Sequence, residues 1–238
     1  MHAILLAAGR GRRLETPEPK CLVQVGGRTL LDRHLDNMPK AGIDRLTLVV
    51  GYEQQRIRDH LAKRAPSLPI EIIENPRYER GSIVSLHCAS HLIGDGALWM
   101  DADVLYPAEL LARLVASKHD NCVLLDRRSE ETGEEMMLGV RDGRVHRIAR
   151  KVLHEGPWDV VGEAVGFAKV GGEGARIMRS ILDEEVAAER LDQEYEAAMN
   201  TAFGRIRWGF EPIDEFAWTE IDFREDVEKA ERILATSA

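Results

Sequence analysis

Apolar runs and amphipathic stretches alternate along the N-terminal half of the chain. Four short, largely apolar runs are each followed by glycine or an acidic residue, as is typical of buried strands. They span residues 3–8, 46–50, 70–73 and 97–100. Between them, apolar residues recur at helical spacing over 30–38 and 57–62. Strands that alternate with helices through short connections predict an α/β fold, with a mixed, mostly parallel sheet covered by helices on both faces.

The C-terminal half continues this pattern and ends in a helix. We expect strands over 121–126 and 161–167, and a hairpin that turns at Asp142-Gly143 between 136–140 and 145–148. Ser82 directly precedes the next expected helix, and we predict that it is the N-cap. Helices are expected over 83–92, 192–200 and, with an amphipathic pattern, 224–236.

Charge and composition narrow the function. The chain has 32 basic and 41 acidic residues and a net charge of −9, which argues against a nucleic-acid partner because such proteins present a basic face. The three cysteines lie far apart without metal-type spacing, which indicates reduced thiols and a cytoplasmic location. No apolar run reaches the ~18 residues of a membrane span, and the opening apolar run is too short for a signal peptide.

A turn rich in glycine and arginine follows the first predicted strand. It reads Gly9-Arg10-Gly11-Arg12-Arg13, and two prolines then lead to Lys20. Glycines allow the backbone to approach a ligand closely, while arginine side chains and free amides suit a polyphosphate. Leu14 stands where the dinucleotide fingerprint requires its third glycine, and no Gly-Lys-Ser/Thr of a Walker loop is present. The turn therefore predicts a phosphate site that differs from both the dinucleotide fingerprint and the Walker loop.

The opening twenty residues resemble the signature of MobA-like and sugar-phosphate NTP transferases. That signature is an apolar strand, L-A-A-G-x-G-x-R-L, a proline and P-K. The chain matches it with Leu6-Ala7-Ala8-Gly9-x-Gly11-x-Arg13-Leu14 and Pro19-Lys20. The resemblance implies a Rossmann-like nucleotidyltransferase fold, in which Arg13 and Lys20 serve catalysis. It implies a nucleotide-binding set of Leu6, Ala7, Ala8, Gly9, Arg10, Gly11, Arg12, Arg13 and Lys20.

A second nucleotide segment is implied further along. The run Ser82-Ile83-Val84-Ser85-Leu86 is similar to the helix start that helps hold base and ribose in the phospho-alcohol branch of this family. The resemblance therefore adds Ser82 and Ser85 to the nucleotide site. A simple capped helix is the alternative.

Two acidic motifs are candidate metal ligands. Asp101 and Asp103 directly follow the apolar run 97–100, and ligand sites of α/β sheets gather at the carboxyl ends of strands. Far downstream, Glu220 and Asp222 again place two carboxylates two residues apart. The resemblance implies that Asp103 and Asp222 bind Mg²⁺ with Glu220 beside them, and that Asp101 contacts the nucleotide. The alternatives are an acidic loop and a helix cap.

The resemblance also implies three features that determine which acceptor binds. Lys151 follows the predicted hairpin, where the family has a catalytic lysine that binds the acceptor phosphate, with Arg147 and Arg150 as alternatives. Glu163 is a lone carboxylate in an apolar run, which is costly unless it is paired or used. Its context, Gly162-Glu163-Ala164-Val165-Gly166, resembles the G-E-x-x-G of enzymes that activate phosphocholine and 2-aminoethylphosphonate.

The segment 192–200 resembles a helix of the same branch that reads Y/W-Y/W-E-x-A. Tyr195 and Glu196 match it, which implies that they bind the acceptor, but Glu194 replaces an aromatic residue. Aromatic faces bind quaternary ammonium, whereas a primary amine prefers carboxylates and hydrogen bonds. The replacement of an aromatic residue by Glu194 therefore favours an acceptor that carries a primary amine. Trp158, Trp208 and Phe210 could restore an aromatic cage.

Together these features predict a cytidylyltransferase that joins CTP to a phospho-alcohol or phosphonate acceptor and releases pyrophosphate, with Mg²⁺ as cofactor. We expect one domain over 1–238 that acts as a monomer or homodimer. It would comprise a nucleotide-binding part over about 1–110, an acceptor-binding part over about 111–222 and a C-terminal helix over 224–236. The alternatives are a sugar-1-phosphate nucleotidyltransferase that uses UTP, dTTP or GTP, a transferase to a molybdopterin-type acceptor, and a nucleotide-binding protein without turnover.

Overall fold

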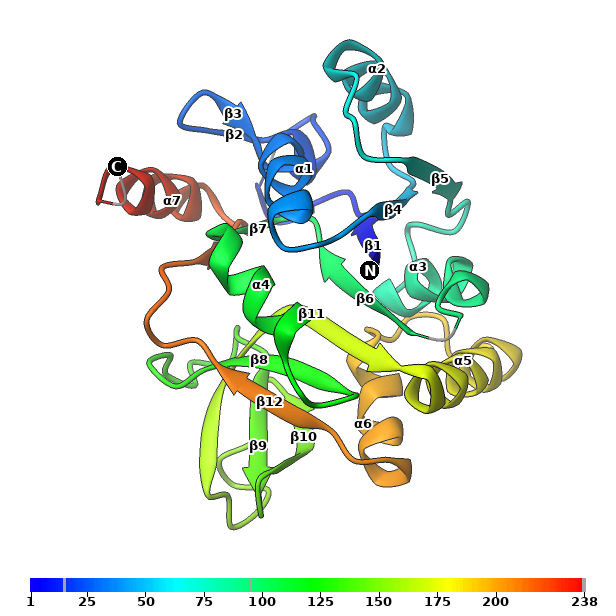
Figure 1. Ribbon diagram of the computed structural model, residues 1–238, viewed down its shortest axis with the longest axis vertical. Helices are drawn as coiled ribbons and strands as arrows, with labels where there is room; N and C mark the ends of the chain where they lie inside the picture. Colours follow the sequence, from blue (N-terminus) through cyan, green and yellow to red (C-terminus); the bar gives the residue numbers. More distant parts are fainter. Residues whose placement is uncertain (15, 95, 237–238) are drawn as a thin grey trace.

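A mixed sheet runs through the computed structural model, which describes residues 1–14, 16–94 and 96–236 (Figure 1). Nine strands form it in this part of the chain: seven follow the order β10-β9-β11-β6-β1-β4-β5, and β8 pairs with β11 and β12. The strands are β1 (His2–Ala7), β4 (Arg45–Val50), β5 (Ile70–Glu74), β6 (Gly96–Asp101), β8 (Cys122–Asp126), β9 (Met137–Arg141), β10 (Arg144–Ala149), β11 (Val160–Gly171) and β12 (Gly209–Pro212). Two small sheets join β2 (Gln24–Val25) to β3 (Arg28–Thr29) and β7 (Val104–Leu105) to β13 (Thr219–Glu220).

Helices and short 3-10 turns connect these strands. The helices are α1 (Leu30–Lys40), α2 (Gln54–Arg64), α3 (Ser82–Cys88), α4 (Ala108–Ala116), α5 (Gly172–Ala187), α6 (Glu196–Arg205) and α7 (Arg224–Thr236). The 3-10 turns are η1 (Arg12–Leu14), η2 (Lys20–Leu22) and η3 (Ser90–Leu92). Among the described residues, no helix has the length and apolar character needed to cross a membrane.

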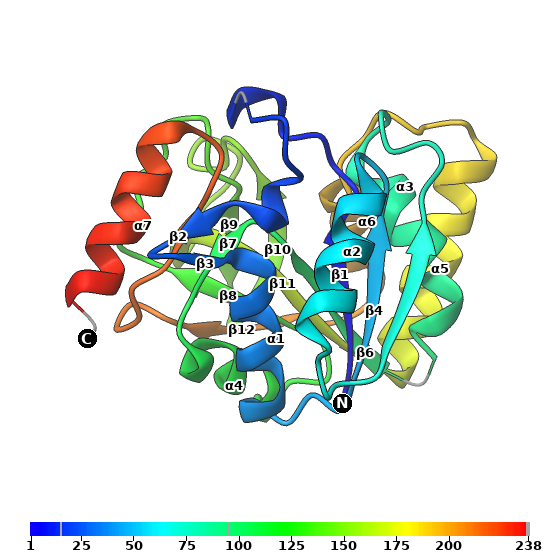
Figure 2. The ribbon, with the colours of Figure 1, turned by 90° about the horizontal axis from the view of Figure 1, so that it is seen from above.

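Alternate side chains of β1 enter two separate cores. Leu5 packs with apolar side chains of α1, α2 and α4, whereas Ile4 packs with those of α3, α5 and α6. Figure 2 shows the same layers, with α3 and α5 on one side of the parallel strands and α1 on the other. Strands β1, β4, β5 and β6 are parallel, and because both faces of β1 are covered, its residues after His2 are all apolar.

The long strand β11 joins this parallel half to the C-terminal strands. It pairs antiparallel with β6, β8 and β9. Its register with β8 shifts between Ala164 and Ala168, around Gly166, whose φ is +77°. This irregularity changes the direction of the side chains that β11 presents near the end of β6.

The predicted fold class, with helices on both faces of a mixed, mostly parallel sheet, is confirmed. Two predictions about helix starts are wrong. Gly81, and not Ser82, is the N-cap of α3, and the Ser82 hydroxyl instead accepts a hydrogen bond from the Tyr195 N–H at 2.9 Å. The helix expected from 192 begins only at Glu196 and continues to Arg205. The expected domain over 1–238 also includes residues 15, 95, 237 and 238, which lie outside the described part.

Candidate active site

A first cavity of about 520 Å³ opens where β1 and β6 end. Eleven predicted nucleotide-binding residues line it: Leu6, Ala7, Ala8, Gly9, Gly11, Arg12, Arg13, Lys20, Ser82, Ser85 and Asp101. Arg10 is the exception, because its guanidinium lies over the Tyr52 ring, 5.4 Å from the centroid, and does not line the cavity. Ser85 is buried and accepts a hydrogen bond from the Asn75 side chain at 3.0 Å.

The turn after β1 depends on Gly11. Its φ is +62°, and a side chain there would overlap the aliphatic part of Lys20. The turn η2 begins at Lys20 directly after Pro19, and its next two residues, Cys21 and Leu22, are buried. Lys20 is thus held between a glycine contact and a buried turn, with its amine directed towards the end of β6.

The two distant acidic motifs meet through the β7–β13 pair. Glu220 lies opposite Val104 in that pair, and the Ile221 N–H donates to the Asp103 carbonyl at 2.9 Å. As a result, carboxylate oxygens of Asp103, Glu220 and Asp222 lie within 4.8 Å of one another. Desolvation, together with the charges of Asp103 and Asp222, raises the pKa of Glu220 to about 8.

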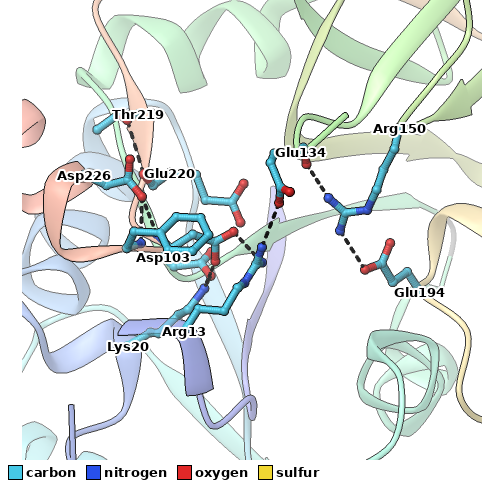
Figure 3. Close-up of polar contacts among 11 residues, drawn as sticks. Arg13, Lys20, Asp103, Glu134, Arg150, Glu194, Thr219, Glu220 and Asp226 are labelled. Atoms are coloured by element: carbon cyan, nitrogen blue, oxygen red, sulfur yellow. Dashed lines mark hydrogen bonds and ion pairs between the residues drawn. The ribbon is translucent and has the colours of Figure 1, made fainter. Parts of the chain in front are cut away.

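Lys20 lies between two of these carboxylates (Figure 3). Its amine donates to Asp103 Oδ2 at 2.8 Å and also pairs with Asp222. Burial disfavours the ammonium, but the two carboxylates outweigh this effect and raise the Lys20 pKa. The lysine therefore stays charged and partly neutralises the cluster.

Arg13 links the cluster to the C-terminal half. Its guanidinium donates to Asp222 at 2.6 Å and to Glu134 at 3.3 Å. Arg150 donates to the Glu134 carbonyl and lies 3.2 Å from Glu194, so charged contacts extend across the site (Figure 3).

A second cavity, of about 490 Å³, adjoins the first and shares Lys20, Asp101 and Asp103 with it. The Tyr195 hydroxyl donates to Asp101 Oδ2 at 2.7 Å. Burial, Asp103 and Glu196 raise the pKa of Asp101, and burial also raises the pKa of Glu196 to about 7. Burial and the neighbouring acidic groups therefore make the carboxyls of Asp101 and Glu196 harder to ionise than they are in water.

The charges that line the second cavity are unequal: nine carboxylates face four cations. The carboxylates belong to Glu79, Asp101, Asp103, Glu134, Asp192, Glu194, Glu196, Glu220 and Asp222, and the cations to Arg13, Lys20, Arg80 and Arg150. Such a cavity suits cationic groups and metal ions, and it disfavours a ligand that is only anionic.

Glu163 does not line the same cavity as Tyr195 and Glu196. Its neighbour Ala164 lines the second cavity, whereas Glu163 lines a third cavity of about 610 Å³ and accepts a hydrogen bond from Ser129. Because successive side chains of a strand point to opposite faces, only one of the two neighbours faces Tyr195.

Lys151 lines none of the three cavities, whereas the neighbouring Arg150, one of the two alternatives, lines the second. The three other aromatic candidates do not form a cage. Trp208 is fully buried against Trp99 and Phe203, and the Trp158 indole donates to the Val152 carbonyl at 2.7 Å. Phe210 is partly buried and packs against the core that contains Trp208.

Sequence reasoning missed Arg80 and Glu134. Arg80 lines both of the first two cavities and forms a two-pronged ion pair with Asp192, at 2.5 and 2.7 Å. It lies two residues before Ser82, which is expected at the nucleotide site, so its charge was a usable signal. Glu134 lies in an irregular loop between β8 and β9, where no periodicity marks it.

The carboxylate cluster fits a hard divalent cation. Asp103 Oδ1 is buried and has no hydrogen-bond partner among the described residues, although Oδ2 pairs with Lys20. Three carboxylates with one uncommitted buried oxygen are the donor set that Mg²⁺ prefers.

A known protein family matches most of the chain. A family model described as "MobA-like NTP transferase domain" matches residues 3–167. The "Bifunctional IPC transferase and DIPP synthase" of Thermococcus kodakarensis is 28% identical over 244 residues, which cover 100% of this chain and 51% of that protein. The "CMP-5'-(3-aminopropyl)phosphonate synthase" of Streptomyces rubellomurinus is 24% identical over 97% of this chain and 38% of that protein.

A third relative, the "2-aminoethylphosphonate cytidylyltransferase" of Lancefieldella rimae, is 28% identical over 63% of this chain and 61% of its own length. The matches cover only 33–52% of the length of the bifunctional IPC transferase and DIPP synthase relatives.

Solved structures share the fold. The CTP:phosphocholine cytidylyltransferase of Streptococcus pneumoniae has a TM-score of 0.79 at 22% identity, and the match covers 98% of both chains. The inositol-1-phosphate CTP transferase of T. maritima has a TM-score of 0.78 at 18% identity, over 98% of this chain and 95% of that one.

Proposed function

The chain belongs to the family of MobA-like NTP transferase domains, and from this membership we propose that it is a Mg²⁺-dependent cytidylyltransferase. Its acceptor would be a small phosphate or phosphonate that also carries an ammonium group, and the products would be a cytidylylated acceptor and pyrophosphate. One observation carries this proposal: nine carboxylates line the second cavity directly beside a nucleotide-type turn.

The reaction needs no protein nucleophile. An oxygen of the acceptor phosphate attacks the α-phosphorus of CTP, and the bond from that phosphorus to pyrophosphate breaks. The protein contributes by holding the two substrates in line and by stabilising charge. We propose that the backbone of 9–12, Arg13 and Lys20 hold the triphosphate.

Asp103 and Asp222, with Glu220 beside them, would hold Mg²⁺. When bound, the ion neutralises charge on phosphate oxygens. Lys20 and Arg13 already pair with Asp103 and Asp222. We infer that both cations exchange these carboxylates for phosphate oxygens when nucleotide and metal enter together, because each carboxylate then gains a metal partner.

Arg150 is our candidate for the acceptor phosphate in place of Lys151, because it lines the second cavity. A guanidinium also binds phosphate in a two-pronged geometry that an ammonium cannot offer. Arg80 lines the same cavity and is a second candidate.

Asp101, Tyr195 and Glu196 would receive the ammonium end. A primary ammonium has three N–H donors that can satisfy these oxygens, whereas a quaternary ammonium has none and depends on aromatic faces. The names of the Streptomyces and Lancefieldella relatives, which refer to aminoalkyl phosphonates, support a primary amine.

An inositol-phosphate acceptor is the second candidate, because a relative described as an IPC transferase matches the whole chain. A neutral polyol could donate hydroxyl hydrogen bonds to the same carboxylates, but it would leave their charge unbalanced. The two candidates therefore differ in whether the ligand carries a cation.

Pyrophosphate release tests both candidates. CTP, UTP, ATP, GTP and dTTP would each be combined with 2-aminoethylphosphonate, phosphoethanolamine, phosphocholine, inositol-1-phosphate and glucose-1-phosphate, with Mg²⁺ or with EDTA. We expect turnover with CTP and a primary-amine acceptor, and none with EDTA. Turnover with inositol-1-phosphate alone would replace our acceptor by the second candidate. Turnover with glucose-1-phosphate alone would refute both.

A further inference from the structure

Phe223 is an exposed aromatic side chain beside the proposed catalytic residues. It is 38% exposed, and in the described part of the chain only Met1 and Leu153 are other large apolar residues of comparable exposure. Its ring faces the Arg13 guanidinium, whose carbon lies 5.1 Å from the ring centroid. This is the geometry of a cation–π contact.

The position of Phe223 is fixed by the start of α7. The N–H groups of Asp222 and Phe223 both donate to Asp226 Oδ2, at 2.9 and 2.7 Å. One capping carboxylate therefore orients both the metal-ligand candidate and the aromatic residue that follows it. The backbone of Phe223 is therefore held directly beside that of Asp222.

A bound substrate would compete for some contacts of Arg13 and leave another unchanged. Its partner Asp222 is a candidate metal ligand, and its partner Glu134 is an exposed carboxylate at 3.3 Å. A divalent cation competes for Asp222, and phosphate oxygens compete with both carboxylates for the guanidinium. The Phe223 ring is neutral and competes with neither.

We propose that Phe223 is a positioning residue for nucleotide binding: its ring holds the Arg13 guanidinium in place while Arg13 exchanges Asp222 for the triphosphate. This inference rests on the proposed function, since it takes the ligand of Arg13 to be a nucleoside triphosphate. It also accounts for an exposed phenylalanine at the edge of a polar site.

The test is CTP affinity, measured by calorimetry with Mg²⁺ and without acceptor. Phe223→Leu keeps an apolar side chain but removes the aromatic face, and we expect it to weaken CTP binding about three- to thirtyfold. Phe223→Tyr keeps the face and should bind CTP like the wild type. Leu153→Ala, which removes an exposed apolar side chain elsewhere, is the matched control and should have no effect.

A double-mutant cycle separates positioning from a structural role. In an Arg13→Ala background, Phe223→Leu should cause no further loss of CTP affinity, because the ring then has no guanidinium to hold. An undiminished loss in that background would overturn the inference, as would equal CTP affinity of Phe223→Leu and wild type. If the wild type binds none of the five nucleoside triphosphates, the proposed function itself fails, and the two failures are thereby distinguished.

Discussion

At the scale of single residues, two neighbours in sequence, Arg150 and Lys151, differ in whether they reach the site. Arg150 lines the second cavity, and Lys151 lines none of the three. We predict that Arg150→Ala raises the KM for the acceptor about tenfold or more, the cost of one charged hydrogen bond. Lys151→Ala, the matched control, should leave it unchanged. Steady-state kinetics with varied acceptor check this, and the opposite ranking would return the role to Lys151.

Gly166 shows how a missing side chain shapes the second cavity. Its φ is +77°, and a Cβ there would overlap the Asp101 carboxylate. We predict that Gly166→Ala lowers the free energy of unfolding by about 1–3 kcal/mol and raises the acceptor KM, because Asp101 must move. Urea denaturation and kinetics measure the two effects.

Gly204 is the control for this substitution. It lies in α6, its φ is not positive, and a Cβ there would meet no atom within 4 Å. Gly204→Ala should therefore stabilise the protein by about 0.5–1 kcal/mol. A Gly166→Ala variant that behaves like Gly204→Ala would show that Asp101 tolerates the added methyl group.

The ionisation of Glu196 should make acceptor binding depend on pH. The fold raises its pKa to about 7 through burial, so ionising it costs stability as pH rises from its ordinary pKa of about 4.5 to about 7. A bound ammonium needs the ionised form. We therefore predict that the KM for an amino acceptor falls as pH rises from about 6 to about 8. Glu196→Gln should lose that part of the pH profile, and an identical profile in the variant would assign the titration to another group.

At the scale of elements, the short β7–β13 pair and the start of α7 build the carboxylate cluster. Each strand of the pair has only two residues, yet their pairing brings together Asp103 and Asp222, which are far apart in sequence. The Asp226 side chain then fixes the backbone at Asp222 and Phe223. The relative positions of the carboxylates in the cluster therefore depend on the two-residue strands β7 and β13 and on the start of α7.

Asp226→Ala tests this dependence. Removing the cap should lower the free energy of unfolding by about 1 kcal/mol, and it should also lower kcat because Asp222 loses its backbone anchor. Glu225→Ala, in the same first turn, is the control: it removes a negative charge near the helix start but, within the described part of the chain, no side-chain hydrogen bond. Loss of stability at unchanged kcat would show that the cap does not serve the cluster.

At the scale of the whole molecule, the site draws on segments from both ends of the chain. Lys20 comes from the N-terminal turn, Asp103 from the turn between β6 and β7, and Asp222 from the segment before α7. The sheet is continuous through the β6–β11 pair. The proposed nucleotide-binding part over about 1–110 and acceptor-binding part over about 111–222 would then act across one sheet.

A ligand that bridges these segments should stabilise the whole fold. At about a hundred times their dissociation constants, Mg²⁺ and CTP together should add about 2.7 kcal/mol, which raises Tm by about 5–10 °C in a protein of this size. EDTA should remove most of the gain, and Asp103→Asn should show a smaller gain than wild type. Thermal denaturation checks this prediction, and a Tm shift that EDTA does not change would argue against the metal site.

The sequence by itself determined the features that depend on contiguous or periodically spaced residues. Apolar periodicity predicts the strands and helices that form the two cores, and the turn from Leu6 to Lys20 predicts the first cavity because neighbours in a tight turn stay neighbours in space. The two acidic motifs could be identified for the same reason, since each places two carboxylates two residues apart.

Only the tertiary structure decided which side chains meet. It separates Glu163 from Tyr195, because adjacent residues of β11 face opposite sides, and it places Arg150 rather than Lys151 at the second cavity. It makes Gly81 the cap of α3 and frees Ser82 to contact the Tyr195 backbone. These outcomes depend on register, on side-chain direction and on pairs up to 209 residues apart, such as Arg13 with Asp222, and no local pattern along the chain encodes them.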